Sequence, residues 1–235
     1  MFTKSAAIYD ALYAFKDYLA ESRRVHELIE RHKVSPGRSV LDVGCGTGGH
    51  IAHLKGLYET TGLDLDEQML SVARGKHPEI PFHRDDMTSF DLGRRFDAVI
   101  CLFSSIGYVR TEVRLRDAVA AMRRHLVAGG VLILEPWLTP SAVSPGPPHA
   151  LFVDEPDLKA ARISVGRVEG ALSVIDFHYL VGTAAGVERF TEQHALGLFT
   201  HEQYLAAMQA TGLRVTHDPE GLTERGLYVG EAPKA

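Results

Sequence analysis

The stretch that decides the fold reads Val40-Leu41-Asp42-Val43-Gly44-Cys45-Gly46-Thr47-Gly48-Gly49. Its first residues are mainly apolar and predict a buried strand, and the glycines that follow predict a tight turn into a helix. Gly44, Gly46 and Gly49 satisfy the G-x-G-x-x-G spacing that lets a backbone approach an adenosine cofactor closely. The stretch therefore predicts a cofactor site at the end of a strand, but it does not by itself identify the cofactor.

Strands and helices alternate on both sides of this turn. Helical spacing of apolar residues predicts a helix from 6 to 33, and a later helix is expected over 112–126 with Gly129-Gly130 as its C-cap. Short apolar runs predict buried strands at 39–43, 60–64, 81–83, 96–102 and 131–134. This order predicts a doubly wound, parallel α/β sheet whose strands are buried on both faces.

The pattern changes after Pro136. Prolines are frequent between 140 and 156 and predict a loop, and alternating residues then predict an antiparallel insert of about three strands at 162–165, 174–180 and 187–190. Thr200 and Gln203 predict a capping box for a helix over 201–211, followed by strands at 213–215 and 226–229. We expect one domain, 1–235, with a helical lid at 1–36 and a substrate wall at 138–197.

The composition narrows the range of partners. The 235 residues carry a net charge of −5, which disfavours nucleic acid as a partner because phosphate binding needs clustered Lys and Arg. No apolar run has the length of a membrane span, and the N-terminal residues 1–5 lack the apolar stretch of a signal peptide. We expect a cytoplasmic protein with no membrane partner, in which Cys45 and Cys101 are reduced.

Three acidic positions help to identify the cofactor. A carboxylate at Asp42 would repel the pyrophosphate of a dinucleotide, whereas it suits the ammonium and sulfonium groups of S-adenosyl-L-methionine. Asp64 ends the second predicted strand. An acidic residue at this position binds ribose hydroxyls both in dinucleotide-binding proteins and in proteins that bind S-adenosyl-L-methionine. Asp85-Asp86-Met87 follows the third strand. The ordered series resembles the motifs of class I methyltransferases, in which an acid at the place of Asp86 accepts the adenine amino group and an apolar neighbour covers the ring.

That resemblance implies a Rossmann-like seven-stranded sheet and S-adenosyl-L-methionine as the cofactor. It also implies that N-terminal tyrosines cover the cofactor. The cofactor-binding residues expected on this basis are Tyr9, Tyr18, Asp42, Gly44, Cys45, Gly46, Asp64, Leu65, Met69, Asp85, Asp86, Met87, Leu102 and Phe103. No metal is expected, because His50 and His53 have no third ligand at a matching spacing.

A narrower resemblance rests on strings outside the glycine turn: 92–96 (LGRRF), 103–108 (FSSIGY), 135–137 (EPW), 210–215 (ATGLRV) and 225–230 (RGLYVG). They resemble the N,N-dimethyltransferases that act on TDP-3-amino-deoxyhexoses in macrolide antibiotic biosynthesis. The resemblance implies a small-molecule amino-sugar substrate and a homodimer. Leu138 replaces a second tryptophan of the family, and 221–224 (GLTE) replaces Gly-Pro-Ser-Gly. These departures keep another small amine or hydroxyl acceptor as an alternative.

Methyl transfer from a sulfonium is an in-line displacement, so positioning supplies much of the rate. An amine attacks only when neutral, and the nearby sulfonium lowers its pKa, so a strong base is not required. Tyr108, just past the fourth strand, is the predicted catalytic residue, which orients the amine or helps to remove a proton; the alternative is a packing aromatic.

Four residues are predicted to bind substrate. Arg225 is the expected diphosphate clamp, because its planar fork suits phosphate oxygens, and Tyr108, His178 and Tyr179 are expected to line the pocket. Glu135 ends the fifth strand without an assigned role. Two rival classes remain open: a nicotinamide-dependent oxidoreductase, and a binding module that holds the cofactor without turnover.

Overall fold

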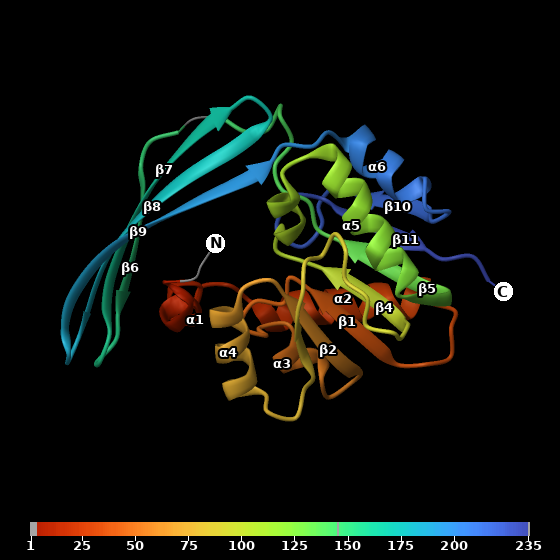
Figure 1. Cartoon of the computed structure of the whole chain (residues 1–235), viewed down its shortest axis with the longest axis horizontal. Coiled ribbons are helices and arrows are strands. Elements are labelled where there is room, and N and C mark those ends of the chain that lie inside the picture. Colours follow the sequence, from red (N-terminus) through yellow and green to blue (C-terminus); the bar gives the residue numbers. More distant parts are fainter. Residues whose placement is uncertain (1–3, 145, 235) are drawn as a thin grey trace.

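The computed structural model describes residues 4–144 and 146–234. Residues 1–3, which belong both to the predicted lid and to the N-terminal stretch that lacks a signal-peptide pattern, lie outside the described residues. Two β-sheets make up the fold (Figure 1). The larger sheet is flanked by helices, and the smaller one is a long curved sheet that stands beside it, with the first short helix, α1, in the angle between the two. None of the described helices is long and apolar enough to cross a membrane.

The larger sheet has seven strands in the order β10-β11-β5-β4-β1-β2-β3. Strands β3, β2, β1, β4 and β5 are mutually parallel, and β11 is antiparallel to both of its neighbours, which confirms the predicted fold class. The strands are β1 (Ser39–Val43), β2 (Glu59–Asp64), β3 (Phe82–Arg84), β4 (Phe96–Cys101), β5 (Leu126–Leu134), β10 (Arg214–Asp218) and β11 (Leu227–Glu231).

Helices cover both faces of this sheet. One face packs against α5 (Glu112–Arg124) and α6 (His201–Gln209), and the other against α2 (Tyr18–His32) and α3 (Ile51–Leu54). A smaller cluster joins α3 to α4 (Glu67–Lys76) beside β3. Burial on both faces holds fully for β4, but β3 exposes two of its three residues because it is the edge strand. The prediction of burial on both faces was wrong for that strand.

The predicted helix over 6–33 is broken. It consists of η1 (Ala6–Ile8), α1 (Tyr9–Leu12) and then α2, which begins after a turn. Asp17 caps α2, its carboxylate accepting a hydrogen bond of 2.8 Å from the backbone N–H of Ala20. The break allows the two parts to lie at different angles, so that Tyr9 and Tyr18 both reach the same pocket.

Gly129 and Gly130 do not cap the preceding helix. Helix α5 ends at Arg124 with His125 as its C-cap, and both glycines lie inside β5, where the pairing with β4 shifts register. Gly129 has φ +72°, and a Cβ on Gly130 would lie 2.9 Å from the carbonyl oxygen of Asp97. The glycines are needed for a bulge that brings two strands close together, which local sequence does not distinguish from a helix end.

The smaller sheet contains four antiparallel strands, one more than the approximate number predicted: β6 (His149–Asp154), β7 (Lys159–Glu169), β8 (Leu172–Thr183) and β9 (Gly186–Gly197). Strand β6 lies within the segment predicted as a loop. It is an exposed edge strand next to prolines, so it shows little of the alternation that marks a half-buried strand. The inner face of the sheet packs against α1 through Phe177, Tyr179 and Val181.

Candidate active site

A pocket lies where the carboxyl ends of β1 and β4 meet the N-terminal helices. This is the edge at which open parallel sheets bind ligands. The pocket brings together eight of the predicted cofactor residues and adds four residues that were not predicted. It is lined by Tyr9, Tyr18, Asp42, Gly44, Cys45, Gly46, Leu102 and Phe103, and also by Thr47, Gly49, His50 and Ser105.

The glycine turn is fixed by backbone hydrogen bonds. Gly44 and Cys45 donate to the carbonyl oxygen of Leu63 at 2.7 and 3.0 Å, and Gly46 donates to the Asp64 carboxylate at 2.8 Å. Gly44 has φ +74°, and a Cβ at that position would lie 2.6 Å from the Cβ of Ser105. Only glycine fits there, because the β1 turn and the segment after β4 approach each other at this point.

Asp42 contributes a buried carboxyl group to the pocket. It is 2% exposed, and its Oδ2 has no hydrogen-bond partner within the described residues. Burial raises the pKa of Asp42 to about 6, a shift that His50 opposes and Asp64 reinforces. A buried carboxylate oxygen without a donor is costly, so this atom fits a ligand that brings a cationic donor. The ammonium group of S-adenosylmethionine is such a donor.

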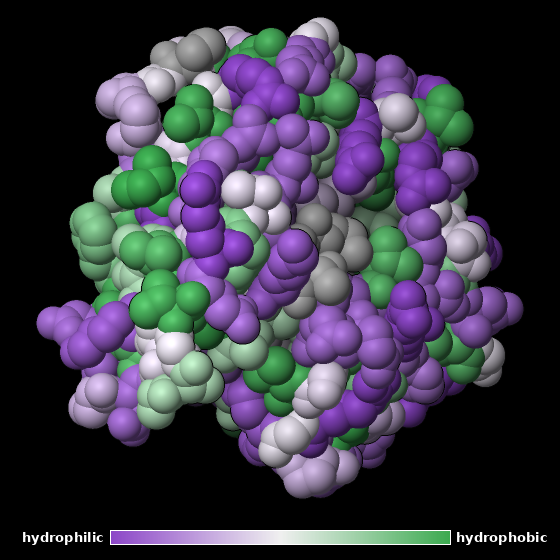
Figure 2. Space-filling model, turned by 60° about the vertical axis from the view of Figure 1, so that its left-hand side comes forward, coloured by the Kyte–Doolittle hydropathy of each residue, from purple (hydrophilic) through white to green (hydrophobic). Residues whose placement is uncertain are grey.

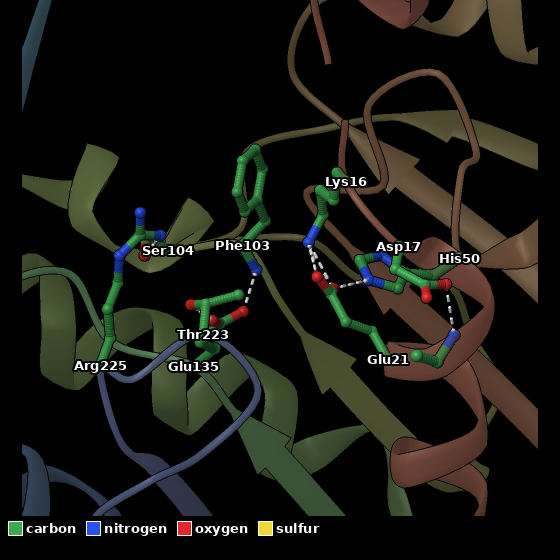
Figure 3. Close-up of polar contacts among 10 residues, drawn as sticks. Lys16, Asp17, Glu21, His50, Phe103, Ser104, Glu135, Thr223 and Arg225 are labelled. Atoms are coloured by element: carbon green, nitrogen blue, oxygen red, sulfur yellow. Dashed lines mark hydrogen bonds and ion pairs between the residues drawn. The ribbon is translucent and has the colours of Figure 1, made fainter. Parts of the chain in front are cut away.

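Behind the pocket a buried ionic network orients the start of α2 (Figure 3). The Glu21 carboxylate is 2.8 Å from His50 Nε2 and pairs with the Lys16 ammonium group. Burial raises the pKa of Glu21, but these hydrogen bonds outweigh it and hold the pKa below its usual value. His50 is thus committed to Glu21, and the described residues contain no cluster that would hold a metal ion.

The predicted ribose and adenine residues lie around the end of β2 and beyond β3. Asp64 accepts backbone N–H bonds from Gly46 and Asp66, at 2.8 and 2.9 Å. Leu65 is an exposed apolar side chain, and a Cβ on Gly46 would lie 3.3 Å from the Met69 methyl carbon. These residues do not line the pocket itself, so their contacts with the cofactor stay predictions.

Asp86 has a structural task of its own. Its Oδ1 accepts from the Thr88 backbone N–H and hydroxyl, and its Oδ2 lies 2.8 Å from an Arg114 guanidinium nitrogen. Asp85 accepts only the N–H of Asp86, at 2.8 Å, in the described structure. The adenine role predicted for Asp86 therefore stays a prediction, and Asp85 is a second candidate because its carboxylate carries fewer hydrogen bonds. Met87 lies on the pocket side, 3.8 Å from where a Gly44 Cβ would be.

The segment after β4 carries backbone strain. Phe103 and Ser104 have φ values of 49° and 61°, a left-handed conformation that side chains other than glycine adopt at a cost. The fully buried Glu135 holds this turn, because its carboxylate accepts the Phe103 N–H at 2.6 Å and the Thr223 hydroxyl (Figure 3). Glu135, unassigned from the sequence, is therefore a positioning residue of the pocket.

Two cations flank the Phe103 ring. The Lys16 ammonium nitrogen lies 4.2 Å from its centroid, and the Arg225 guanidinium carbon lies 5.7 Å from it. Arg225 also lies over the Trp137 ring at 5.0 Å and donates to the Ser104 hydroxyl at 3.1 Å. No carboxylate pairs with Arg225 in the described part of the chain. Its charge is thus available to an anionic ligand.

Two of the predicted substrate residues, Tyr108 and Tyr179, lie where η2 meets the smaller sheet, outside the lining of the cofactor pocket. The half-buried Tyr108, in η2 (Ser105–Val109), has its hydroxyl 2.6 Å from Nδ1 of His194 on β9. Tyr179 is buried on the inner face of β8, stacked on Phe190 at 4.7 Å. His178 is exposed, because successive residues of a strand point to opposite faces. The prediction that His178 lines the pocket was wrong.

The sequence of this chain matches a methyltransferase family model and several curated methyltransferases. Residues 40–130 match a family model described as a methyltransferase domain. The chain is 40% identical to a dTDP-3-amino-3,4,6-trideoxy-alpha-D-glucopyranose N,N-dimethyltransferase of Streptomyces venezuelae, over 96% of both proteins. It is 36% identical to a dTDP-4-amino-2,3,4,6-tetradeoxy-D-glucose N,N-dimethyltransferase of Saccharopolyspora spinosa, over 96% of this chain and 91% of that one.

Solved structures agree with these matches. The crystal structure of Streptomyces venezuelae DesVI superposes with a TM-score of 0.91 at 39% identity, covering 97% of this chain and 98% of that one. CalS10 is an amino pentose methyltransferase from Micromonospora echinaspora solved with S-adenosylmethionine bound. It gives a TM-score of 0.85 at 37% identity, over 98% of this chain and 97% of that one.

Proposed function

Because the chain belongs to the S-adenosylmethionine-dependent methyltransferases, in the family of the dTDP-amino-sugar N,N-dimethyltransferases, we propose that it methylates the amino group of a dTDP-linked deoxy amino sugar. This membership removes the nicotinamide oxidoreductase and the binding module without turnover as alternatives. The observation that carries the substrate class is Arg225, a guanidinium group held beside the pocket without a carboxylate partner in the described structure.

The cofactor end of the site uses residues of the larger sheet. S-adenosylmethionine, when bound, supplies an electrophilic methyl group on a sulfonium. The Asp42 carboxylate accepts a hydrogen bond from the ammonium group, for which its Oδ2, unpartnered among the described residues, is suited. Asp64 accepts hydrogen bonds from the ribose hydroxyls. Tyr9 and Tyr18 cover the pocket from the N-terminal helices and exclude water from it. Asp86 accepts a hydrogen bond from the adenine amino group.

The substrate end lies between η2 and the smaller sheet. Arg225 binds the diphosphate, because its fork of donors matches phosphate oxygens and Ser104 and Trp137 hold it in place. Tyr108 orients the amine from the turn after β4, and Tyr179 lines the wall. The protein thus supplies rate chiefly by fixing donor and acceptor in line, which is worth several kcal/mol of barrier.

Replacing Arg225 by alanine is expected to raise the KM for a dTDP-amino sugar by about 10- to 100-fold, the loss of a hydrogen bond to a charged group. The affinity for S-adenosylmethionine should stay within about twofold, because Arg225 does not line the cofactor pocket. Arg225→Lys should recover only part of the loss, since an ammonium group lacks the fork. Initial rates over a range of sugar concentrations, with titration calorimetry for the cofactor, measure both quantities.

Arg95→Ala is the matched control, because Arg95 is an exposed arginine away from the pocket. An unchanged KM in Arg225→Ala would remove the diphosphate role. Failure of the unmodified protein to methylate any dTDP-amino sugar, with cofactor binding intact, would refute the sugar class. It would favour the alternative of another small amine or hydroxyl acceptor.

The protein is also proposed to be a homodimer. The outer face of the smaller sheet exposes apolar side chains, and Figure 2, in which this side of the molecule is turned forward, shows apolar groups on that surface. The most exposed of these residues are Phe152 and Val187, each 71% exposed, and Leu180 at 52%. Sedimentation equilibrium is expected to give twice the 25.8 kDa of one chain, and a monomer at micromolar concentration would refute the proposal.

A further inference from the structure

Tyr108 is the first member of a chain of three polar side chains that leads away from the active site. Its hydroxyl lies 2.6 Å from Nδ1 of His194, a separation typical of a strong hydrogen bond. His194 is 1% exposed and its ring is held edge-on against Phe177, with centroids 4.9 Å apart. The imidazole is therefore fixed in one orientation toward Tyr108.

The third member is Glu192. It lies two residues before His194 on β9 and so on the same face, with Oε2 3.8 Å from His194 Nε2. Its carboxylate also accepts the backbone N–H groups of Lys4 and Ser5, at 2.7 and 3.1 Å, and the Ser5 hydroxyl at 2.7 Å. Burial raises the pKa of Glu192, but the nearby His194 and the hydrogen bonds from Ser5 and Lys4 hold it below the usual value. Glu192 is thus a fixed negative charge behind the imidazole.

We propose that the Tyr108–His194–Glu192 chain takes up the proton that the substrate amine must lose before each methyl transfer, an inference that rests on the proposed function. The ammonium nitrogen gives a proton to the Tyr108 oxygen while the Tyr108 hydroxyl proton moves to His194 Nδ1. The freed nitrogen lone pair then forms the N–C bond, and the electron pair of the broken C–S bond stays on sulfur. The imidazolium is stabilised by Glu192 and returns its proton to solvent after product release.

The electrostatic surroundings agree with these roles. Burial, the largest cause, lowers the pKa of His194 despite the opposing Glu192, so the imidazole is neutral at pH 7 and able to accept a proton. Burial also keeps the pKa of Tyr108 well above its usual value, so the hydroxyl passes a proton on rather than standing as a phenolate. Among the described residues, the other titratable or charged groups that act on the pair include Arg162 of β7, Tyr179 of β8, Tyr13 after α1 and Asp64 of β2.

The chain explains how an amine that is mostly protonated in water can react at neutral pH. An amine with electron-withdrawing neighbours resembles an α-amino group, with a pKa of about 8, so about one molecule in ten is neutral at pH 7. The bound sulfonium lowers that pKa toward the range of an imidazole, which makes proton transfer to His194 nearly balanced. Two successive methylations release two protons, so the same chain would act in both.

The test is the pH dependence of kcat/KM for a dTDP-amino sugar in the full chain. In His194→Gln the glutamine side chain still accepts a hydrogen bond from the Tyr108 hydroxyl, but it cannot take up a proton. This variant should therefore methylate only substrate molecules whose amino group is already neutral when they bind. Its deficit relative to the unmodified protein should be about 100-fold at pH 6, about tenfold at pH 7 and less than twofold at pH 9, following the neutral fraction of the amine. Tyr108→Phe should show the same pattern, and the double variant should be no worse than either single one.

His178→Gln is the control, since His178 is an exposed histidine on the other face of the same sheet. A deficit of His194→Gln that is equal at pH 6 and pH 9, with normal cofactor affinity, would overturn the relay and leave a structural histidine. NMR titration of the His194 ring, assigned by its loss in His194→Gln, supplies a readout without turnover. A His194 pKa below 6.5 supports the proposed Tyr108–His194–Glu192 relay. A His194 ring that is still protonated at pH 7.5 would exclude His194 as the proton acceptor. Failure of the unmodified protein to methylate the sugar would instead refute the proposed function.

Discussion

Asp42→Asn is expected to weaken the binding of S-adenosylmethionine by about 10- to 150-fold, the worth of a hydrogen bond between charged groups. The carboxylate is buried, and the ligand ammonium group would provide the partner that its Oδ2 lacks among the described residues. The uncharged amide keeps the shape of the side chain but not its charge. Titration calorimetry at pH 8 measures the dissociation constants of both proteins.

The pH dependence of binding sharpens this prediction. Because burial raises the pKa of Asp42 to about 6, cofactor affinity should fall by about tenfold per pH unit below that value, whereas the variant should show no such fall. The stability of the cofactor-free protein changes with pH in the opposite direction, because it decreases as the pH rises. An acid whose pKa is raised on folding stabilises the free protein at low pH, and about 3 kcal/mol of this is lost between pH 4 and 6. Cofactor binding offsets that loss.

Asp157→Asn is the control, because Asp157 is an exposed carboxylate in the turn between β6 and β7. It should leave the cofactor affinity unchanged at every pH. An Asp42→Asn protein that binds S-adenosylmethionine as tightly as the unmodified protein would show that Asp42 does not contact the ammonium group.

Glu135→Ala is expected to lower the free energy of unfolding by about 3–5 kcal/mol, since it leaves two partly buried donors without an acceptor and opens a cavity at a fully buried position. The donors are the Phe103 N–H and the Thr223 hydroxyl, and the first of them holds a left-handed turn in place. For a chain of this length the melting temperature should fall by about 10 °C. Denaturant unfolding and thermal scans measure both values.

Glu135→Gln separates the contributions. It preserves the volume and one acceptor oxygen, so the loss should be only about 1–2 kcal/mol, while the relaxed turn at Phe103 should still reduce kcat. Glu220→Ala removes an exposed carboxylate and should leave stability within about 0.5 kcal/mol. If Glu135→Ala melts at the temperature of the unmodified protein, the turn after β4 is held by something other than this carboxylate.

Much of the fold was readable from local patterns. The capping box of Thr200 and Gln203 appears where the spacing predicts it, because it depends on residues only three positions apart. The glycine turn was readable for the same reason. Strand β6 and the bulge at Gly129 were missed, since an exposed edge strand and a bulge are defined by their partner strands.

The candidate site divides along the same line. Its cofactor half, from Asp42 to Gly46 with Asp64, comes from a turn whose residues are close in sequence, and the pocket collects most of it. Its substrate half depends on distant contacts: Tyr108 meets His194 across 86 positions, and Phe103 meets Glu135 across 32. No local spacing signals either pair.

By itself the sequence determined the strand-turn-helix unit, the α/β order and the class of cofactor, because these follow from propensity, periodicity and charge within a few neighbouring residues. Only the tertiary structure decided which face of β8 carries Tyr179 and which carries His178, that Glu135 holds a strained turn, and that a histidine stands behind Tyr108. Those outcomes depend on strand register and on packing between segments far apart in the chain. The energy of such a contact depends on both residues together, so neither residue predicts it from its own sequence neighbourhood.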